Sequence, residues 1–144
     1  MLKFRTMRVD AECVTGPVWA RQNDPRRTWL GALLRATSLD ELPQLVNVLR
    51  GEMSIVGPRP HALSAKAAER LYWEIDDRYR HRHVVKPGVT GLAQIRGFRG
   101  ATVLASDLSN RLASDLEYLR NWSMNRDIWI IFRTIFVIRH DNAF

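Results

Sequence analysis

The chain has 144 residues, of which 46% are hydrophobic and 26% are charged. This length fits one domain with a true core, and this composition excludes disordered, collagen-like and low-complexity chains. Its one cysteine, Cys13, forms no internal disulfide, and no cysteine and histidine pattern has zinc-site spacing. Because 22 Lys and Arg outnumber 15 Asp and Glu, the formal charge is +7, and phosphate-bearing partners are expected.

The first predicted element is a strand over residues 1 to 8, whose alternation places Lys3 and Arg5 on one face. Residues 10 to 25 contain the turn formers Gly-Pro and Asn-Asp-Pro, which indicate an exposed loop. A helix is predicted from about residue 26 to 36. Its apolar face consists of Trp29, Leu30, Leu33 and Leu34.

The next helix is predicted to begin at Ser38, since Ser38 and Glu41 have the spacing of a capping box. Pro43 removes a hydrogen bond in its first turns, so an irregular beginning is expected. Asp40 and Glu41 would sit at the positive end of the helix dipole, which favours their ionised forms. A carboxylate there is a competent nucleophile towards phosphorus, and its neighbour can hold Mg²⁺. From spacing alone, a helix cap without catalytic function is a more common role for two such acids than a catalytic pair.

A short strand is predicted over residues 53 to 56, followed by a rigid turn of sequence Gly-Pro-Arg-Pro. Pro58 and Pro60 restrict the backbone of Arg59 and would pre-position its guanidinium for a diphosphate. The alternative is an ordinary rigid turn with a solvated arginine.

A helix is predicted from residue 64 to about 79, with Ala68, Leu71, Tyr72, Ile75 and Tyr79 as its buried stripe. The segment from 78 to 88 is the most basic and contains Lys86. In this segment His81 and His83 flank Arg82, a pattern that favours an exposed basic strand over a catalytic histidine. Glycines that follow the cations would let backbone approach an anion closely.

Two further helices are predicted towards the end of the chain. The first begins at Ser106 or Asp107, with Asp115 beside its leucine line. The second begins near residues 125 to 127 and is apolar nearly all round to residue 138. It is too short to span a bilayer, so it is either a buried core helix or a helix in a membrane interface. Together the elements predict one small, helix-rich α/β (α+β) domain over residues 1–144 with a short sheet.

Five ordered blocks carry a resemblance to a known family. They are Lys3 to Met7, Ser38 to Ser54 with Arg35, Val56 to Pro60, Val85 to Gln94, and Asp115 to Ser123. The chain thereby resembles the bacterial sugar transferases, the monotopic phosphoglycosyl transferases. The segments from Gly97 to Thr102 and from Asn142 to Phe144 are similar to the ends of undecaprenyl-phosphate glucose phosphotransferases that initiate exopolysaccharide synthesis.

The resemblance implies transfer of a sugar 1-phosphate from a UDP-sugar to undecaprenyl phosphate, with release of UMP and with Mg²⁺ as cofactor. UDP-glucose or UDP-galactose is the expected donor. By the same matching, Asp40 is the nucleophile that forms a covalent phosphosugar, and Glu41 and Arg59 complete the catalytic set. The expected substrate-binding residues are Lys3, Arg5, Arg35, Pro58, Pro60 and Lys86, and the expected metal-binding residues are Glu41 and Asp115.

The resemblance also implies a location on the cytoplasmic face of the bacterial inner membrane. Family members carry a hydrophobic re-entrant helix before the first block, so the chain is expected to be an N-terminally truncated catalytic domain with interface helices. Two alternatives stay open from the residues: a basic nucleic-acid-binding module, and a noncatalytic remnant that serves as an assembly partner. No nucleic-acid partner is expected if the resemblance holds.

Overall fold

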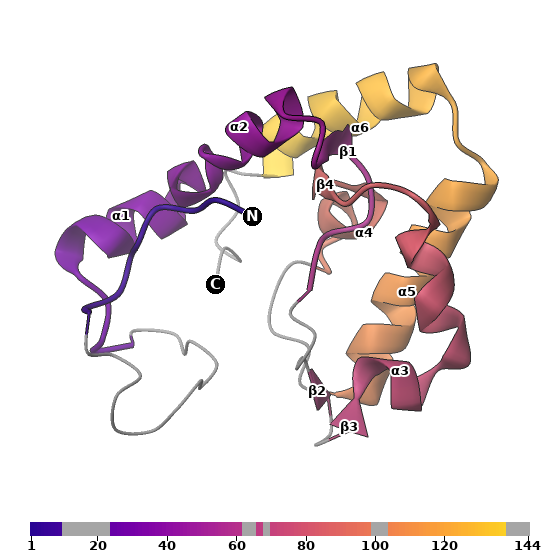
Figure 1. Cartoon of the computed structure of the whole chain (residues 1–144), viewed down its shortest axis with the longest axis horizontal. Helices are drawn as coiled ribbons and strands as arrows, with labels where there is room; N and C mark the ends of the chain where they lie inside the picture. Colours follow the sequence, from indigo (N-terminus) through magenta and orange to yellow (C-terminus); the bar gives the residue numbers. More distant parts are fainter. Residues whose placement is uncertain (10–23, 62–65, 68–69, 99–103, 138–144) are drawn as a thin grey trace.

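The computed structural model describes residues 1–9, 24–61, 66–67, 70–98 and 104–137. It is a small helix-rich domain with a short parallel sheet, as predicted (Figure 1). In chain order the elements are α1 (Trp29–Ala36), η1 (Leu39–Glu41), α2 (Gln44–Leu49), β1 (Ser54–Val56), β2 (Lys66–Ala67), β3 (Arg70–Leu71), α3 (Tyr72–Ile75), η2 (Asp77–Val84), β4 (Gly88–Thr90), α4 (Leu92–Ile95), α5 (Ala105–Arg120) and α6 (Met124–Val137). Among the described residues, no helix is both long enough and apolar enough to cross a bilayer.

The parallel pair of β1 and β4 joins two distant parts of the chain. Ser54 pairs with Gly88 and Val56 pairs with Thr90. At Gly88 the neighbouring backbone comes so close that an added Cβ would lie 2.2 Å from the nitrogen of Gly57. Only glycine permits this approach, which holds the turn after β1 against β4.

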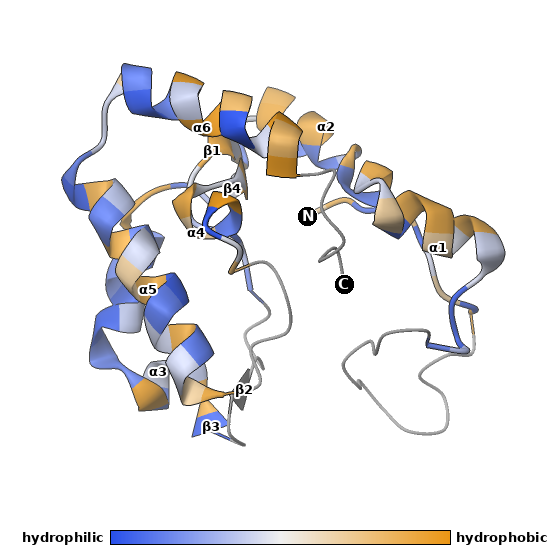
Figure 2. Cartoon of the chain, turned by 180° about the vertical axis from the view of Figure 1, so that it is seen from behind, coloured by the Kyte–Doolittle hydropathy of each residue, from blue (hydrophilic) through white to orange (hydrophobic). Residues whose placement is uncertain are grey.

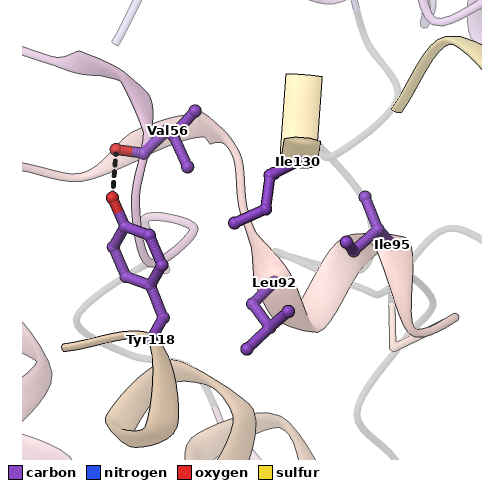
Figure 3. Close-up of a cluster of buried hydrophobic side chains, with 5 residues drawn as sticks. All are labelled: Val56, Leu92, Ile95, Tyr118 and Ile130. Carbon is purple, nitrogen blue, oxygen red and sulfur yellow. Dashed lines mark hydrogen bonds between the residues drawn. The ribbon is translucent and has the colours of Figure 1, made fainter. Parts of the chain in front are cut away.

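Two apolar clusters form the core, and α5 contributes to both. The first contains Tyr72, Tyr79, Leu108 and Leu112. The second contains Val56, Leu92, Ile95, Tyr118 and Ile130, which converge from β1, α4, α5 and α6 (Figure 3). The hydroxyl of Tyr118 also donates to Asp127 at 2.8 Å, so α5 and α6 are tied by a polar contact beside their apolar one.

The prediction of a strand over residues 1 to 8 is wrong. This segment is extended, but within the described residues its only strand-like pairing is one antiparallel bridge from Met7 to Arg27. Instead, the N-terminal segment begins beside α2 and runs back along α1 to the residues that precede this helix (Figure 1). It is held by single hydrogen bonds, from Phe4 N to Asp40 O at 2.9 Å and from Leu2 N to Asn47 Oδ1 at 2.8 Å. The segment therefore follows the helices rather than a sheet edge.

The predicted helix from residue 64 to 79 is also wrong over its described part. Its beginning is a hairpin of β2 and β3, and only α3 is α-helical; residues 62–65 and 68–69, with Ala68, lie outside the described residues. The basic segment that follows is a 3-10 helix, η2, rather than a strand. Three residues per turn place Tyr79 and Arg82 on the same side, where both are buried, whereas His81 and His83 are exposed as predicted.

The helices predicted near residues 26, 106 and 126 are confirmed as α1, α5 and α6. Yet α1, η1, α2 and α6 leave most of their apolar side chains exposed: Trp29 is 82% exposed and Leu49 is 87% exposed. We call these exposed apolar residues the apolar edge; the helices α6, α2 and α1 that carry most of them follow one another along one side of the molecule (Figure 2). Its residues are Trp29, Leu30, Leu33, Leu39, Leu42, Leu45, Val46, Leu49, Ile128, Trp129, Ile131, Phe132, Ile135 and Phe136.

The contact between α1 and the N-terminal segment predicts a test of stability. A Cβ at Gly31 would lie 2.0 Å from the carbonyl oxygen of Thr6. We expect Gly31→Ala to lower the free energy of unfolding by about 1–3 kcal/mol, because the segment must move away from α1. Urea unfolding followed by circular dichroism measures this, with Ala32→Ser at the adjacent exposed position as control. Equal stability of the two variants would contradict the close contact.

Candidate active site

The two adjacent carboxylates lie in the short helix η1, at the bend between α1 and α2. Ser38 precedes them with φ of +56°, a left-handed conformation that is rare for serine, and its side chain caps nothing. The predicted capping box is therefore wrong: the Glu41 side chain contacts distant residues instead. Pro43 precedes the first residue of α2, so the irregular helix beginning is confirmed.

Asp40 is the most buried acid of this bend, with 3% of its surface exposed. Its Oδ2 lies 2.9 Å from Nζ of Lys3, which comes from the N-terminal segment. The same Nζ donates to Oε1 of Glu41 at 3.3 Å. Lys3 is much more exposed than either acid, so an approaching anion meets this ammonium group beside the carboxylates.

Glu41 forms a two-point pair with Arg59. Arg59 donates from Nη1 to Oε2 of Glu41 at 3.0 Å, and its Nη2 contacts Oε1. Burial raises the pKa of Glu41, but hydrogen bonds and charge from Arg59, with help from Lys3, lower it to about 2. The pKa of Arg59, which burial lowers, is raised overall by Glu41 and Asp40. Both partners are thus charged at neutral pH.

The backbone of Arg59 is held from both sides. Pro58 precedes it and accepts a hydrogen bond from Gly88 N at 3.0 Å. The carbonyl oxygen of Arg59 accepts from Nη2 of Arg82 at 2.6 Å. Because Pro58 and Pro60 already restrict the chain, the guanidinium of Arg59 projects from a rigid base towards η1.

Behind this turn lies a buried polar cluster that the sequence analysis did not find. Arg82 pairs with Asp115 at 2.8 Å, and each side chain is 2% exposed. Arg82 also contacts His61, whose other ring nitrogen lies 2.9 Å from Nη1 of Arg111. Its members come from the turn after β1, from η2 and from α5. The one signal for it was the spacing of three between Tyr79 and Arg82, which the expectation of a strand concealed.

The remaining predicted residues lie at different distances from this centre. Arg35 is half-buried and donates from Nε to Oγ1 of Thr6 at 2.8 Å, so it fastens the N-terminal segment. Arg5 and Lys86 are exposed, and neither forms a hydrogen bond or ion pair with any residue that the structure describes. The structure therefore brings together Lys3, Asp40, Glu41 and Arg59. Asp115 contacts none of these directly; it pairs with Arg82, and Arg82 binds the carbonyl oxygen of Arg59.

Among the residues that the structure describes, the carboxylate pair of Asp40 and Glu41 is the place that fits a magnesium ion. Within the described part of the chain, no group of three His, Cys, Asp or Glu side chains is placed to hold a metal. Mg²⁺ is usually bound through one or two carboxylates together with substrate phosphates, and Asp40 and Glu41 supply such a pair. Asp115 does not extend this set, since its Oδ2 pairs with Arg82 in the interior.

The arrangement has the chemical parts of a phosphoryl-transfer centre. A buried carboxylate can attack phosphorus, and cations on both sides can neutralise the phosphate oxygens that otherwise repel it. The Glu41 carboxylate stays ionised and holds Arg59 in place. Acid-base catalysis by Glu41 is not favoured, because its pKa of about 2 is far from neutral pH.

Comparison with known proteins shows which family the chain resembles. The model of the family described as bacterial sugar transferase matches residues 1–141. The chain is 51% identical over 133 residues to an exopolysaccharide production protein of Rhizobium leguminosarum bv. phaseoli. The aligned residues make up 92% of this chain and 66% of that protein. The chain is also 52% identical over 136 residues to the UDP-glucose:undecaprenyl-phosphate glucose-1-phosphate transferase of Escherichia coli K12. This alignment covers 93% of this chain and 28% of that protein.

A protein of the same name from Caulobacter vibrioides is 45% identical over 147 residues, a match that includes 100% of this chain and 53% of that protein. The chain thus spans less than two thirds of the length of each of these three relatives. The family model, in contrast, covers the chain almost from end to end. On this ground the chain belongs to the bacterial sugar transferase family.

Proposed function

We propose that this chain transfers a sugar 1-phosphate from a UDP-sugar to undecaprenyl phosphate and thereby initiates exopolysaccharide synthesis. The observation that carries the proposal is the buried Asp40 with Lys3 at 2.9 Å, next to the charged pair of Glu41 and Arg59. The names of the Escherichia coli and Caulobacter vibrioides relatives specify UDP-glucose and undecaprenyl phosphate, so glucose is the sugar we propose.

The proposed reaction has two steps that both pass through Asp40. In the first, a carboxylate oxygen of Asp40 bonds to the β-phosphorus of the UDP-sugar, and the bond from that phosphorus to the bridging oxygen breaks and releases UMP. In the second, a phosphate oxygen of undecaprenyl phosphate attacks the same phosphorus. The bond from Asp40 to phosphorus then breaks, which frees the carboxylate and yields the lipid diphosphate sugar.

The charges around Asp40 support this order of events. Attack by one anion on another is repulsive unless positive charge is already in place. Lys3 and Arg59 supply it, and Glu41 keeps the guanidinium of Arg59 oriented before the substrate arrives. In the proposal Arg35 maintains the path of the segment that carries Lys3, whereas Arg5 and Lys86 contribute long-range attraction for the anionic substrate.

Magnesium is the cofactor we propose, and Glu41 and Asp40 would hold it together with the diphosphate of the substrate. When bound, Mg²⁺ would supply charge that stabilises the leaving phosphate. Asp115, in this proposal, acts on the same site only through Arg82 and the carbonyl oxygen of Arg59.

The location we propose is the cytoplasmic face of the bacterial inner membrane, and the apolar edge supports the contact with a lipid surface that this location requires. Leu39 and Leu42 of this edge directly flank the two acids, so the reacting carboxylate lies within two residues of exposed apolar surface. Because the phosphate of the lipid acceptor lies at the membrane surface, the reacting carboxylate must lie close to that surface to reach it. In α6, Arg133 lies over the ring of Trp129 at 5.9 Å, a combination typical of helices at the headgroup level.

Replacement of Asp40 tests the covalent step. We expect Asp40→Asn to abolish both UMP release from UDP-glucose and the hexose-phosphate adduct, because an amide is not a nucleophile towards phosphorus. Intact-protein mass spectrometry with Mg²⁺, and in parallel with EDTA, measures the adduct. Asp77→Asn, an exposed acid of η2, is the matched control and should keep the adduct. An adduct of unchanged yield on the Asp40 variant would refute the mechanism.

Replacement of Arg59 tests the role of its guanidinium. Arg59→Ala should lower the rate of UMP release by about a hundredfold, the size seen when one preorganised donor is lost. Arg59→Lys should recover only part of that rate, because an ammonium group cannot make the two-point contact. Arg78→Ala removes an exposed arginine that pairs with Asp76 and should change nothing. Full activity of Arg59→Ala would remove Arg59 from the site.

Substitutions on α6 test membrane contact. Phe132 is 61% exposed on the apolar edge, and burial of such a side chain contributes about 1.5–3 kcal/mol. We therefore expect Phe132→Ser to weaken partition into vesicles of phosphatidylethanolamine and phosphatidylglycerol at least tenfold, measured by co-sedimentation. Val84→Ser, at an apolar residue of η2 that is 81% exposed and lies outside the apolar edge, serves as control. Equal partition of both variants would exclude α6 from the membrane contact.

A further inference from the structure

A hydrogen bond from Arg82 connects the buried cluster to Arg59. Arg82 donates from Nη2 to the carbonyl oxygen of Arg59 at 2.6 Å and pairs through the same Nη2 with Asp115 at 2.8 Å. Its Nη1 donates to the hydroxyl of Tyr79 at 3.0 Å and contacts Nδ1 of His61. The orientation of the Arg82 guanidinium therefore decides where the carbonyl of Arg59 is held.

His61 stands two residues after Arg59 and is the centre of this cluster. Its Nδ1 lies 3.0 Å from the hydroxyl of Tyr79, and its Nε2 lies 2.9 Å from Nη1 of Arg111. Tyr72 meets the ring edge-on with centroids 5.2 Å apart, and Tyr79 stacks with it at 6.3 Å. The ring is thus fixed by aromatic neighbours as well as by polar contacts.

The surroundings keep this imidazole neutral. Burial first, and then the charges of Arg82, Arg111 and Arg59, lower the pKa of His61 to about 2. A neutral imidazole carries one N–H and one acceptor nitrogen. With Nδ1 as its acceptor nitrogen, the neutral ring accepts a hydrogen bond from Nη1 of Arg82 and adds no charge, where a carboxylate would neutralise a guanidinium group and a lysine would repel both.

We propose that His61 is a positioning residue for the transfer reaction: its Nδ1 orients Arg82, and Arg82 in turn holds the carbonyl of Arg59 so that the guanidinium of Arg59 reaches Glu41 and the diphosphate. The inference rests on the proposed function, since it gives Arg59 a role in substrate binding. It adds a residue that makes no contact with Asp40 or Glu41 in the structure.

The restricted backbone explains how such a distant contact takes effect. Pro58 and Pro60 leave Arg59 few alternative conformations, so a shift of its carbonyl moves the whole turn rather than one torsion. A two-point pair of guanidinium and carboxylate depends on alignment, and a displacement of about 1 Å can cost a hundredfold in rate. His61 therefore influences catalysis through geometry and not through its own charge.

Amide substitutions separate the two ring nitrogens. Asparagine places its amide near the position of Nδ1, and glutamine reaches the position of Nε2. His61→Asn should keep the partner of Arg82 and retain at least a third of the rate of UMP release from UDP-glucose. His61→Gln and His61→Leu lose that partner and should reduce kcat at least tenfold. His81→Asn, at an exposed histidine of η2, is the matched control.

A double-mutant cycle with Arg59→Ala distinguishes positioning from loss of structure. In the Arg59→Ala background, His61→Leu should cause no further decrease in kcat, since the residue through which His61 acts is absent. The same tenfold decrease in both backgrounds would overturn the inference while leaving the proposed function intact. Equal rates for His61→Asn and His61→Gln, in proteins of equal melting temperature, would also overturn it. Full activity of Arg59→Ala would overturn the proposed function together with the inference.

Discussion

The ion pair of Glu41 and Arg59 is the interaction on which the site depends. It connects η1, in the arm formed by α1 and α2, to the turn after β1, in the body of the domain. The arm contributes nothing to either apolar cluster, so polar contacts carry much of its placement. An exposed ion pair would contribute little here, but this pair is partly buried and makes two contacts, which fixes direction as well as distance.

The short helix η1 separates two environments within four residues. Leu39 and Leu42 face outward on the apolar edge, whereas Asp40 and Glu41 face Lys3 and Arg59. A regular α-helix does not run through these residues, since η1 is a 3-10 helix of three residues. The left-handed Ser38 and the proline at 43 break that regularity, and the carboxylates turn inward as a consequence.

Periodicity explains which parts of this architecture were predictable. The helix α5 follows from apolar residues at regular spacing, α6 follows from a long apolar run, and the strand at Ser54–Val56 follows from its flanking glycine and proline turns. The Ser38 prediction failed because Glu41 gains more from Arg59, a residue 18 positions away, than from a local cap. Arg82 was missed for a similar reason: only the long-range pairing with Asp115 makes burial of an arginine tolerable, and local pattern does not contain that pairing.

The buried polar cluster behind the site adds little to the stability of the fold, so its contribution is to the position of Arg59. Arg82 and Arg111 lie around one carboxylate, Asp115, whose pKa burial raises to about 6 against the opposing effect of both arginines. Buried ion pairs of this kind add little net stability, because desolvation offsets their attraction. Apolar residues of similar volume would pack the same space between η2 and α5 at lower cost. What they could not supply is a donor aimed at the carbonyl oxygen of Arg59, and that donor fixes the guanidinium opposite Glu41.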